Sequence, residues 1–143
     1  MFQLTKVAEM EGLILALEPL TKHESNLVID SKGLKKMLEE IQSTSLKGMI
    51  DTVSMHLAGE TPDEFYSFLP ELGHFHLMDR DDQSDAHLAL DDGVFKLEGI
   101  FNLPSKSHRY KGSCTLEIMG SNYYQNPRDA IKKSIEKVRE LGI

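Results

Sequence analysis

The stretch "LGHFHLMD" at residues 72–79 is a short apolar run that ends in ionisable side chains. Three other runs in the chain have the same form, namely "GLILALE" (12–18), "LKGMID" (46–51) and "GSCTLEI" (112–118). Apolarity that is continuous rather than alternating indicates strands that are covered on both faces, as in a parallel sheet. We therefore predict four parallel strands at these positions.

Helical patterns lie between the runs. We expect helices at residues 31–41, 61–69 and 126–141, the end of a further helix at residues 1–9, and a short helix at 97–103 after a long connection. The clearest helix starts are Asp30 or Ser31 as an N-cap, a capping box that begins at Thr61, and Asn126 followed by Pro127. The order predicts an α/β fold of four (βα) units with parallel strands and outer helices, in a single domain over 1–143 without a linker.

Composition limits the classes of partner. The chain has 143 residues, 40% of them hydrophobic and 27% charged, with a formal charge of −7, so that no nucleic-acid partner is expected. The N-terminus carries Glu9 and Glu11 where a secretory signal would be uncharged, and no window is apolar enough to span a membrane. We therefore expect a cytoplasmic protein. Cys114 is the single cysteine and cannot form an internal disulfide.

An ionisable residue stands at the end of each predicted strand: Glu18, Asp51, His76 and Glu117. The carboxyl ends of parallel strands meet at one rim, where such folds keep their sites. Three carboxylates and one imidazole at one point would suit one divalent metal ion, namely Mn²⁺, Mg²⁺, Co²⁺ or Zn²⁺. Taken singly, each acid is more typical of a solvated loop residue or a helix cap than of a metal ligand, and it is the same pattern in all four units that favours a metal site. The pair His74 and His76 leaves open which imidazole is the ligand.

Five segments carry a resemblance to a known family: "LALEPLTKHESNLV" (15–28), "MIDTVSMH" (49–56), "GHFHLMDRDD" (73–82), "HLALDDG" (87–93) and "YKGSCTLEIMG" (110–120). They resemble the second half of the xylose-isomerase-like TIM-barrel superfamily, in particular the ketose 3-epimerases of the tagatose and psicose type. The resemblance implies that Glu18, Asp51, His76 and Glu117 bind one divalent metal. It further implies that Glu18 and Glu117 are catalytic, one removing the proton next to a ketose carbonyl through an enediolate and the other returning a proton.

The same resemblance implies a set of substrate-binding residues: Glu24, Ser54, His56, Arg80 and His87. Glu24 matches a glutamate that contacts substrate hydroxyls in the epimerases. Ser54 stands where the epimerases have a histidine, with His56 two residues further on. Asp82 stands where they have an arginine, with Arg80 nearby. The implied substrate is a small sugar, sugar phosphate or polyol derivative, and the implied activity is that of an isomerase or epimerase.

The resemblance covers only half of a barrel, because the family barrel has eight strands and this chain can supply four. We therefore expect either a homo-oligomer or a partner that supplies the N-terminal half of the barrel. A second hypothesis is a catalytically incomplete half barrel that binds metal. A third is a nuclease resembling endonuclease four of the same superfamily, which the acidic charge disfavours.

Overall fold

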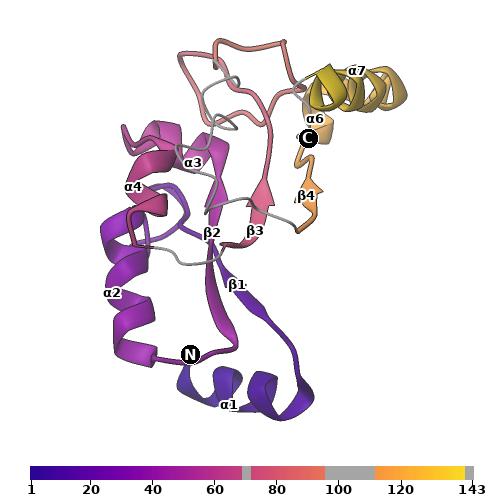
Figure 1. The fold of residues 1–143 in the computed structure, drawn as a ribbon. Coiled ribbons are helices and arrows are strands. Elements are labelled where there is room, and N and C mark those ends of the chain that lie inside the picture. The colour runs from indigo at the N-terminus through magenta and orange to yellow at the C-terminus, as the bar shows by residue number, and fades with distance from the viewer. Residues whose placement is uncertain (69–71, 96–111, 141–143) are drawn as a thin grey trace.

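Four parallel strands form the sheet in the computed structural model, which describes residues 1–68, 72–95 and 112–140. The strands are β1 (Leu15–Leu17), β2 (Leu46–Asp51), β3 (Leu72–His76) and β4 (Cys114–Thr115), and they lie side by side in that order. Figure 1 shows the sheet with α2, α3 and α4 on one side and α7 beyond β4. The prediction of a parallel four-stranded α/β sheet is confirmed.

The described helices are α1 (Phe2–Glu11), α2 (Ser31–Ile41), α3 (Thr52–Leu57), α4 (Pro62–Tyr66), α6 (Gly120–Tyr123) and α7 (Pro127–Glu140). The prediction for residues 31–41 is matched at both ends, and the capping box at Thr61 begins α4, which ends earlier than expected. The sequence pattern missed α3. The helix expected at 97–103 lies outside the described residues. None of the helices in the described ranges is long and apolar enough to cross a membrane.

A register shift places the imidazoles on the face of the sheet that carries Asp51. The pairing of β2 with β3 shifts between Gly48 and Met49, so that Gly73 is the extra residue and His76 pairs with Asp51. A Cβ at Gly73 would stand 2.6 Å from the Cβ of Lys47, so the bulge needs a glycine. The bulge therefore sets the face to which His74 and His76 point.

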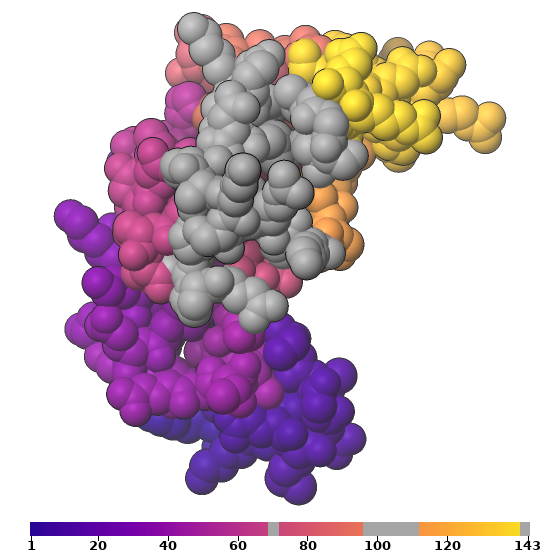
Figure 2. Space-filling view, viewed as in Figure 1, coloured from indigo at the N-terminus to yellow at the C-terminus, as the bar shows by residue number. Residues whose placement is uncertain are grey.

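The hydrophobic core lies between the sheet and helices α2, α3 and α4. Its fully buried members include Leu34, Ile50, Phe65 and Leu77. At the β1 edge the packing ends, because Leu13 and Ile14 are each 56% exposed and β1 pairs only with β2 in the described sheet. Figure 2 shows α1 (indigo) and α7 (yellow) at opposite ends of the molecule. Within residues 1–68, 72–95 and 112–140, helices thus cover one face of the sheet, while Leu13 and Ile14 stay exposed at the β1 edge.

Asp30 is the residue whose loss should most directly shorten α2. Its side chain accepts a hydrogen bond of 2.7 Å from the backbone N–H of Gly33 at the start of the helix. We expect Asp30→Ala to lower the free energy of unfolding by about 1 kcal/mol, the usual effect of removing an N-cap. Urea titration checks this, with Lys35→Ala on the exposed face of α2 as a control. An Asp30→Ala variant as stable as the control would contradict the assignment.

Candidate metal centre

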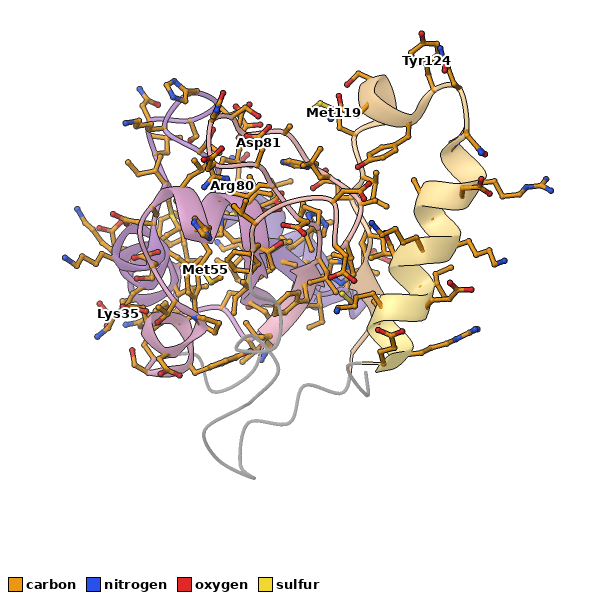
Figure 3. The ribbon with its side chains drawn as sticks, turned by 90° about the horizontal axis from the view of Figure 1, so that it is seen from above. Lys35, Met55, Arg80, Asp81, Met119 and Tyr124 are labelled. Carbon is orange, nitrogen blue, oxygen red and sulfur yellow. The ribbon has the colours of Figure 1, made fainter. Side chains whose placement is uncertain are left out.

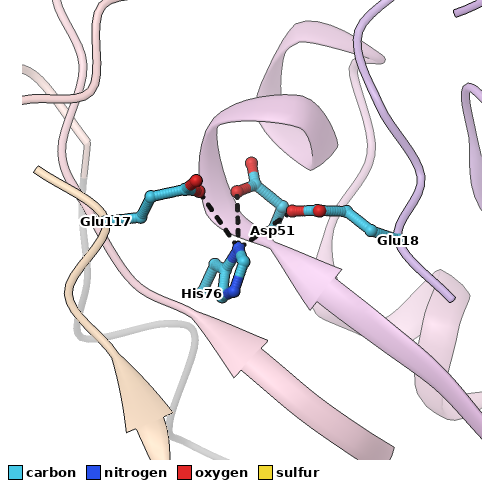
Figure 4. A group of neighbouring side chains, drawn as sticks. All are labelled: Glu18, Asp51, His76 and Glu117. Atoms are coloured by element: carbon cyan, nitrogen blue, oxygen red, sulfur yellow. Dashed lines mark hydrogen bonds and ion pairs between the residues drawn. The ribbon is translucent and has the colours of Figure 1, made fainter. Parts of the chain in front are cut away.

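The four predicted ligands come from four neighbouring strands. Glu18 follows the last residue of β1, Asp51 and His76 end β2 and β3, and Glu117 lies two residues beyond β4. Because the strands are parallel and in sequence order, these positions meet at one rim of the sheet, as Figure 4 shows. One ligand atom from each residue lies within 4.8 Å of all the others. The predicted convergence of these four side chains is therefore present in the structure.

His76 lies at the centre of the group. Its Nδ1 is 2.9 Å from Glu18 Oε1, 3.1 Å from Glu117 Oε2 and 3.8 Å from Asp51 Oδ2. A single ring nitrogen carries at most one hydrogen, so it can donate to only one of three carboxylates. The arrangement thus places more acceptors around Nδ1 than an imidazole can satisfy.

Asp51 gives the clearest sign that a partner belongs in the centre. It is 2% exposed, and its Oδ1 accepts a hydrogen bond of 2.7 Å from the backbone N–H of Ser54. Its Oδ2 is buried without a hydrogen-bond partner. Burial raises the pKa of Asp51, although the bond from Ser54 opposes the rise, and burial likewise raises the pKa of Glu18 against the opposing effect of His76.

A divalent cation fits this donor set. It would give Asp51 Oδ2 a partner and relieve the repulsion between carboxylates that are forced together. Three carboxylate ligands and one imidazole suit a hard or borderline ion. The four residues could therefore hold one divalent metal ion.

Of the two histidines on β3, His74 lies behind the centre. Its ring meets that of His76 edge to face, with the centroids 5.3 Å apart, and its Nε2 lies 2.7 Å from Thr115 Oγ1. Burial lowers the pKa of His74, as does the neighbouring His76. In the part of the chain that the structure describes, it is His76 and not His74 that gathers with the three carboxylates. Thr115 was not predicted as part of the site, although a strand over the predicted run 112–118 would place Thr115 and Glu117 on one face.

Two of the predicted substrate-binding residues adjoin the centre. His87 Nδ1 lies 3.2 Å from the carbonyl oxygen of Glu117 and 3.6 Å from its Oε2. Ser54 is buried, and its backbone N–H donates to Asp51 Oδ1, so that Asp51 caps α3. The structure thus brings His87 and Ser54 into direct contact with predicted ligands.

The other three predicted substrate-binding residues have different surroundings. His56 packs its ring against Phe95 at 4.8 Å, and its pKa is lowered by burial and then by Arg80. Arg80 is buried and donates from its guanidinium to the carbonyl oxygen of Ser84. Glu24 is exposed, and its carboxylate closes a turn by accepting from the N–H and the hydroxyl of Thr21. Their binding roles remain predictions.

The fold and the centre together define a class of protein. Parallel strands with helices packed outside them, and ligands gathered at the carboxyl ends of the strands, are the features of a parallel (βα) barrel with a site at its rim. The chain belongs to the xylose isomerase-like TIM barrel family, whose model matches residues 1–141.

Curated relatives are sugar epimerases. The chain is 30% identical over 140 residues to fructoselysine 3-epimerase of Escherichia coli O157:H7, covering 97% of this chain and 50% of that protein. It is 29% identical to fructoselysine 3-epimerase of Shigella flexneri with the same coverage. The chain thus spans about half the length of the curated relatives that it matches.

Solved structures show the same fold. A D-tagatose 3-epimerase-like protein superposes with a TM-score of 0.74 at 24% identity, and the match covers 97% of this chain and 50% of that protein's chain. The 3-keto-D-glucoside 4-epimerase of E. coli superposes with a TM-score of 0.69 at 18% identity, and the match covers 91% of this chain and 48% of that protein's chain. A D-psicose 3-epimerase solved in the presence of D-fructose superposes with a TM-score of 0.65 at 21% identity, and the match covers 79% of this chain and 37% of that protein's chain. The resemblance to a family of sugar epimerases and isomerases is confirmed.

Proposed function

We propose that this chain is the metal-binding part of a divalent-metal-dependent epimerase or isomerase that acts on a small sugar, sugar phosphate or polyol derivative. The observation that carries the proposal is the buried, unpartnered Oδ2 of Asp51 among ligand atoms of Glu18, His76 and Glu117. The similarity to fructoselysine 3-epimerase supports a sugar derivative as substrate.

The metal supplies one part of the chemistry. Glu18, Asp51, His76 and Glu117 would hold one Mn²⁺, Mg²⁺, Co²⁺ or Zn²⁺ ion. When bound, such a cation polarises a substrate carbonyl and makes the proton on the adjacent carbon easier to remove.

The proton transfer falls to the two glutamates. Glu18 and Glu117 approach Nδ1 of His76 from β1 and from the segment after β4, and so lie on two sides of the centre, as Figure 4 shows. We propose that one carboxylate removes the proton next to the carbonyl and gives an enediolate, and that the other returns a proton to the opposite face. Two bases on opposite sides are what inversion at that carbon requires.

The predicted substrate-binding residues complete the proposal. His87 and Ser54 contact ligand residues, and Arg80 and His56 lie close enough for the guanidinium to lower the pKa of the imidazole. Together with Glu24 they offer hydroxyl, imidazole, guanidinium and carboxylate groups to a polar substrate. This mixture suits the hydroxyl groups of a sugar.

A second candidate is a metal-binding half barrel that turns over substrate only in an assembly. The exposed Leu13 and Ile14 at the β1 edge favour it, as do Phe2 and Val7, which α1 leaves 59% and 56% exposed. An unpaired strand edge beside exposed apolar side chains is a surface that proteins normally cover. The cover would be either a second copy of this chain or a partner that supplies the other strands of a barrel.

An activity assay separates the two candidates. The purified chain is incubated with Mn²⁺ and a panel of ketoses and ketosyl amines, alone and with a separately expressed half that carries the first four strands of a relative. Epimer formation by the chain alone supports the first candidate, and formation only in the mixture supports the second. Metal binding without turnover in either arm would contradict both catalytic proposals.

A further inference from the structure

Asp79 lies three residues beyond His76 and has no role in the centre described so far. It is 1% exposed, and its carboxylate accepts hydrogen bonds from four backbone N–H groups. The donors are Arg80 at 2.8 Å, Asp91 at 3.1 Å, Gly93 at 3.0 Å and Phe95 at 3.0 Å. Because all four partners are backbone donors, Asp79 fixes the course of the chain rather than one side chain.

The segment 80–95 is folded back on Asp79. The backbone of Asp79 also exchanges two hydrogen bonds with Leu88, of 2.9 and 2.7 Å, and the N–H of Val94 donates to the carbonyl of Arg80 at 2.9 Å. A Cβ at Gly93 would overlap the carbonyl oxygen of Arg80 and Oδ1 of Asp79. The loop can therefore close on the carboxylate only with a glycine at this position.

This loop holds the residue that contacts Glu117. The backbone carbonyl oxygen of His87 accepts a hydrogen bond from the N–H of Met119 at 2.9 Å. The Nδ1 of the His87 ring lies 3.2 Å from the backbone carbonyl oxygen of Glu117. Figure 3 views this rim from above, with Arg80 and Met119 labelled. Two contacts thus join the loop closed by Asp79 to the segment that carries Glu117.

Glu117 is the ligand that most needs such support. Its side chain is 47% exposed, against 28% for Glu18, 17% for His76 and 2% for Asp51. It also lies beyond a strand of only two residues, so the sheet does little to fix it. An exposed carboxylate beyond the end of a short strand has more freedom than its partners, and neighbouring contacts must restrict it.

We propose that Asp79 is a positioning residue, which closes the 80–95 loop and, through His87, fixes the carboxylate of Glu117 for metal binding and proton transfer. The inference rests on the proposed function for the role of Glu117. An aspartate is required because Asn would offer an NH₂ donor where Asp79 has an acceptor, leaving backbone N–H groups without partners.

Asp79→Asn tests the proposal through two readouts. In hydrogen exchange, we expect the amides of Asp91, Gly93, Phe95 and Met119 to exchange at least about 10-fold faster, while α2 and β2 keep their protection. In Mn²⁺ titrations, we expect affinity to fall by about 10-fold or more, and to fall no further when Asp79→Asn is added to Glu117→Gln. Asp82→Asn, at an exposed carboxylate of the same loop, is the control and should change neither readout.

Three outcomes would overturn the proposal. One is faster exchange in the loop without any change at Met119. Another is an Mn²⁺ affinity that Asp79→Asn leaves unchanged. A third is that Asp79→Asn lowers Mn²⁺ affinity by the same factor in the Glu117→Gln variant as in the wild type. If the wild-type chain binds no Mn²⁺, the proposed function fails, and exchange at Met119 still decides whether the loop holds that segment. Should Asp79→Asn not fold, Gly93→Ala loosens the same loop and must give the same pattern.

Discussion

Replacing Glu18 or Glu117 with glutamine is expected to lower kcat/KM by at least about 100-fold, the usual range for losing a general acid or base. Both glutamates lie beside Nδ1 of His76, so each change also removes a charge from the metal centre. Glutamine keeps the size of the side chain but cannot accept a proton from carbon. The measurement is epimer formation at saturating Mn²⁺, in whichever assembly shows turnover.

Glu39→Gln is the matched control for both variants. Glu39 lies on the exposed face of α2, where it pairs with Lys35, and it has no contact with the centre. We expect its kcat/KM to equal that of the wild type. Full activity in both Glu18→Gln and Glu117→Gln would show that neither carboxylate transfers the proton.

Asp51→Asn should stabilise the metal-free protein and remove its metal binding. Asparagine can still accept the hydrogen bond from Ser54, while the buried charge of the unpartnered Oδ2 disappears. We expect the free energy of unfolding in EDTA to rise by about 1–3 kcal/mol, the usual penalty of an unsatisfied buried polar group. Affinity for Mn²⁺ should fall by more than about 100-fold, since supporting residues alone account for up to that amount.

The stabilisation should depend on pH in a defined direction. Burial raises the pKa of folded Asp51 above its ordinary value of 3.8. As the pH rises past 3.8, Asp51 ionises in the unfolded chain before it ionises in the folded one. Ionisation of Asp51 therefore disfavours the folded state. The gain from Asp51→Asn should therefore be small near pH 4 and largest at neutral pH.

Chemical unfolding of metal-free samples at several pH values measures this gain. Asp63→Asn in the first turn of α4 is the control, because an exposed position should change stability by less than about 0.5 kcal/mol. An Asp51→Asn variant that is less stable than the wild type in EDTA would contradict the view that Asp51 is strained without a cation.

Much of the sheet and the centre could be predicted because parallel strands bring their carboxyl ends together. The runs that end at Asp51 and His76 predicted β2 and β3, and their ionisable ends meet as expected. The run at 12–18 was partly misread, since Gly12, with φ of 66°, ends α1 before β1 begins. The run at 112–118 forms a strand of only two residues, and Cys114, which lies in a run predicted to be covered on both faces, is half-buried.

Other features depend on contacts that sequence spacing does not show. Asp51 both ends β2 and caps α3, so the apolar pattern gave no separate start for that helix. Three of the four N–H groups that donate to Asp79 lie 12 to 16 residues away, in a segment without periodicity. The roles in substrate binding remain predictions, because they concern contacts with a substrate. These residues are Glu24, Ser54, His56, Arg80 and His87.

The most direct test of the metal centre is the metal content of the chain after equilibration with Mn²⁺, alongside its thermal unfolding. We predict one Mn²⁺ per chain and a stabilisation of about 2.7 kcal/mol at a free metal concentration of 100 Kd. His76→Ala should retain the fold and bind no stoichiometric Mn²⁺, since His76 contacts all three carboxylates. A wild-type chain that binds no stoichiometric Mn²⁺, or a His76→Ala variant that binds it equally well, would contradict the account.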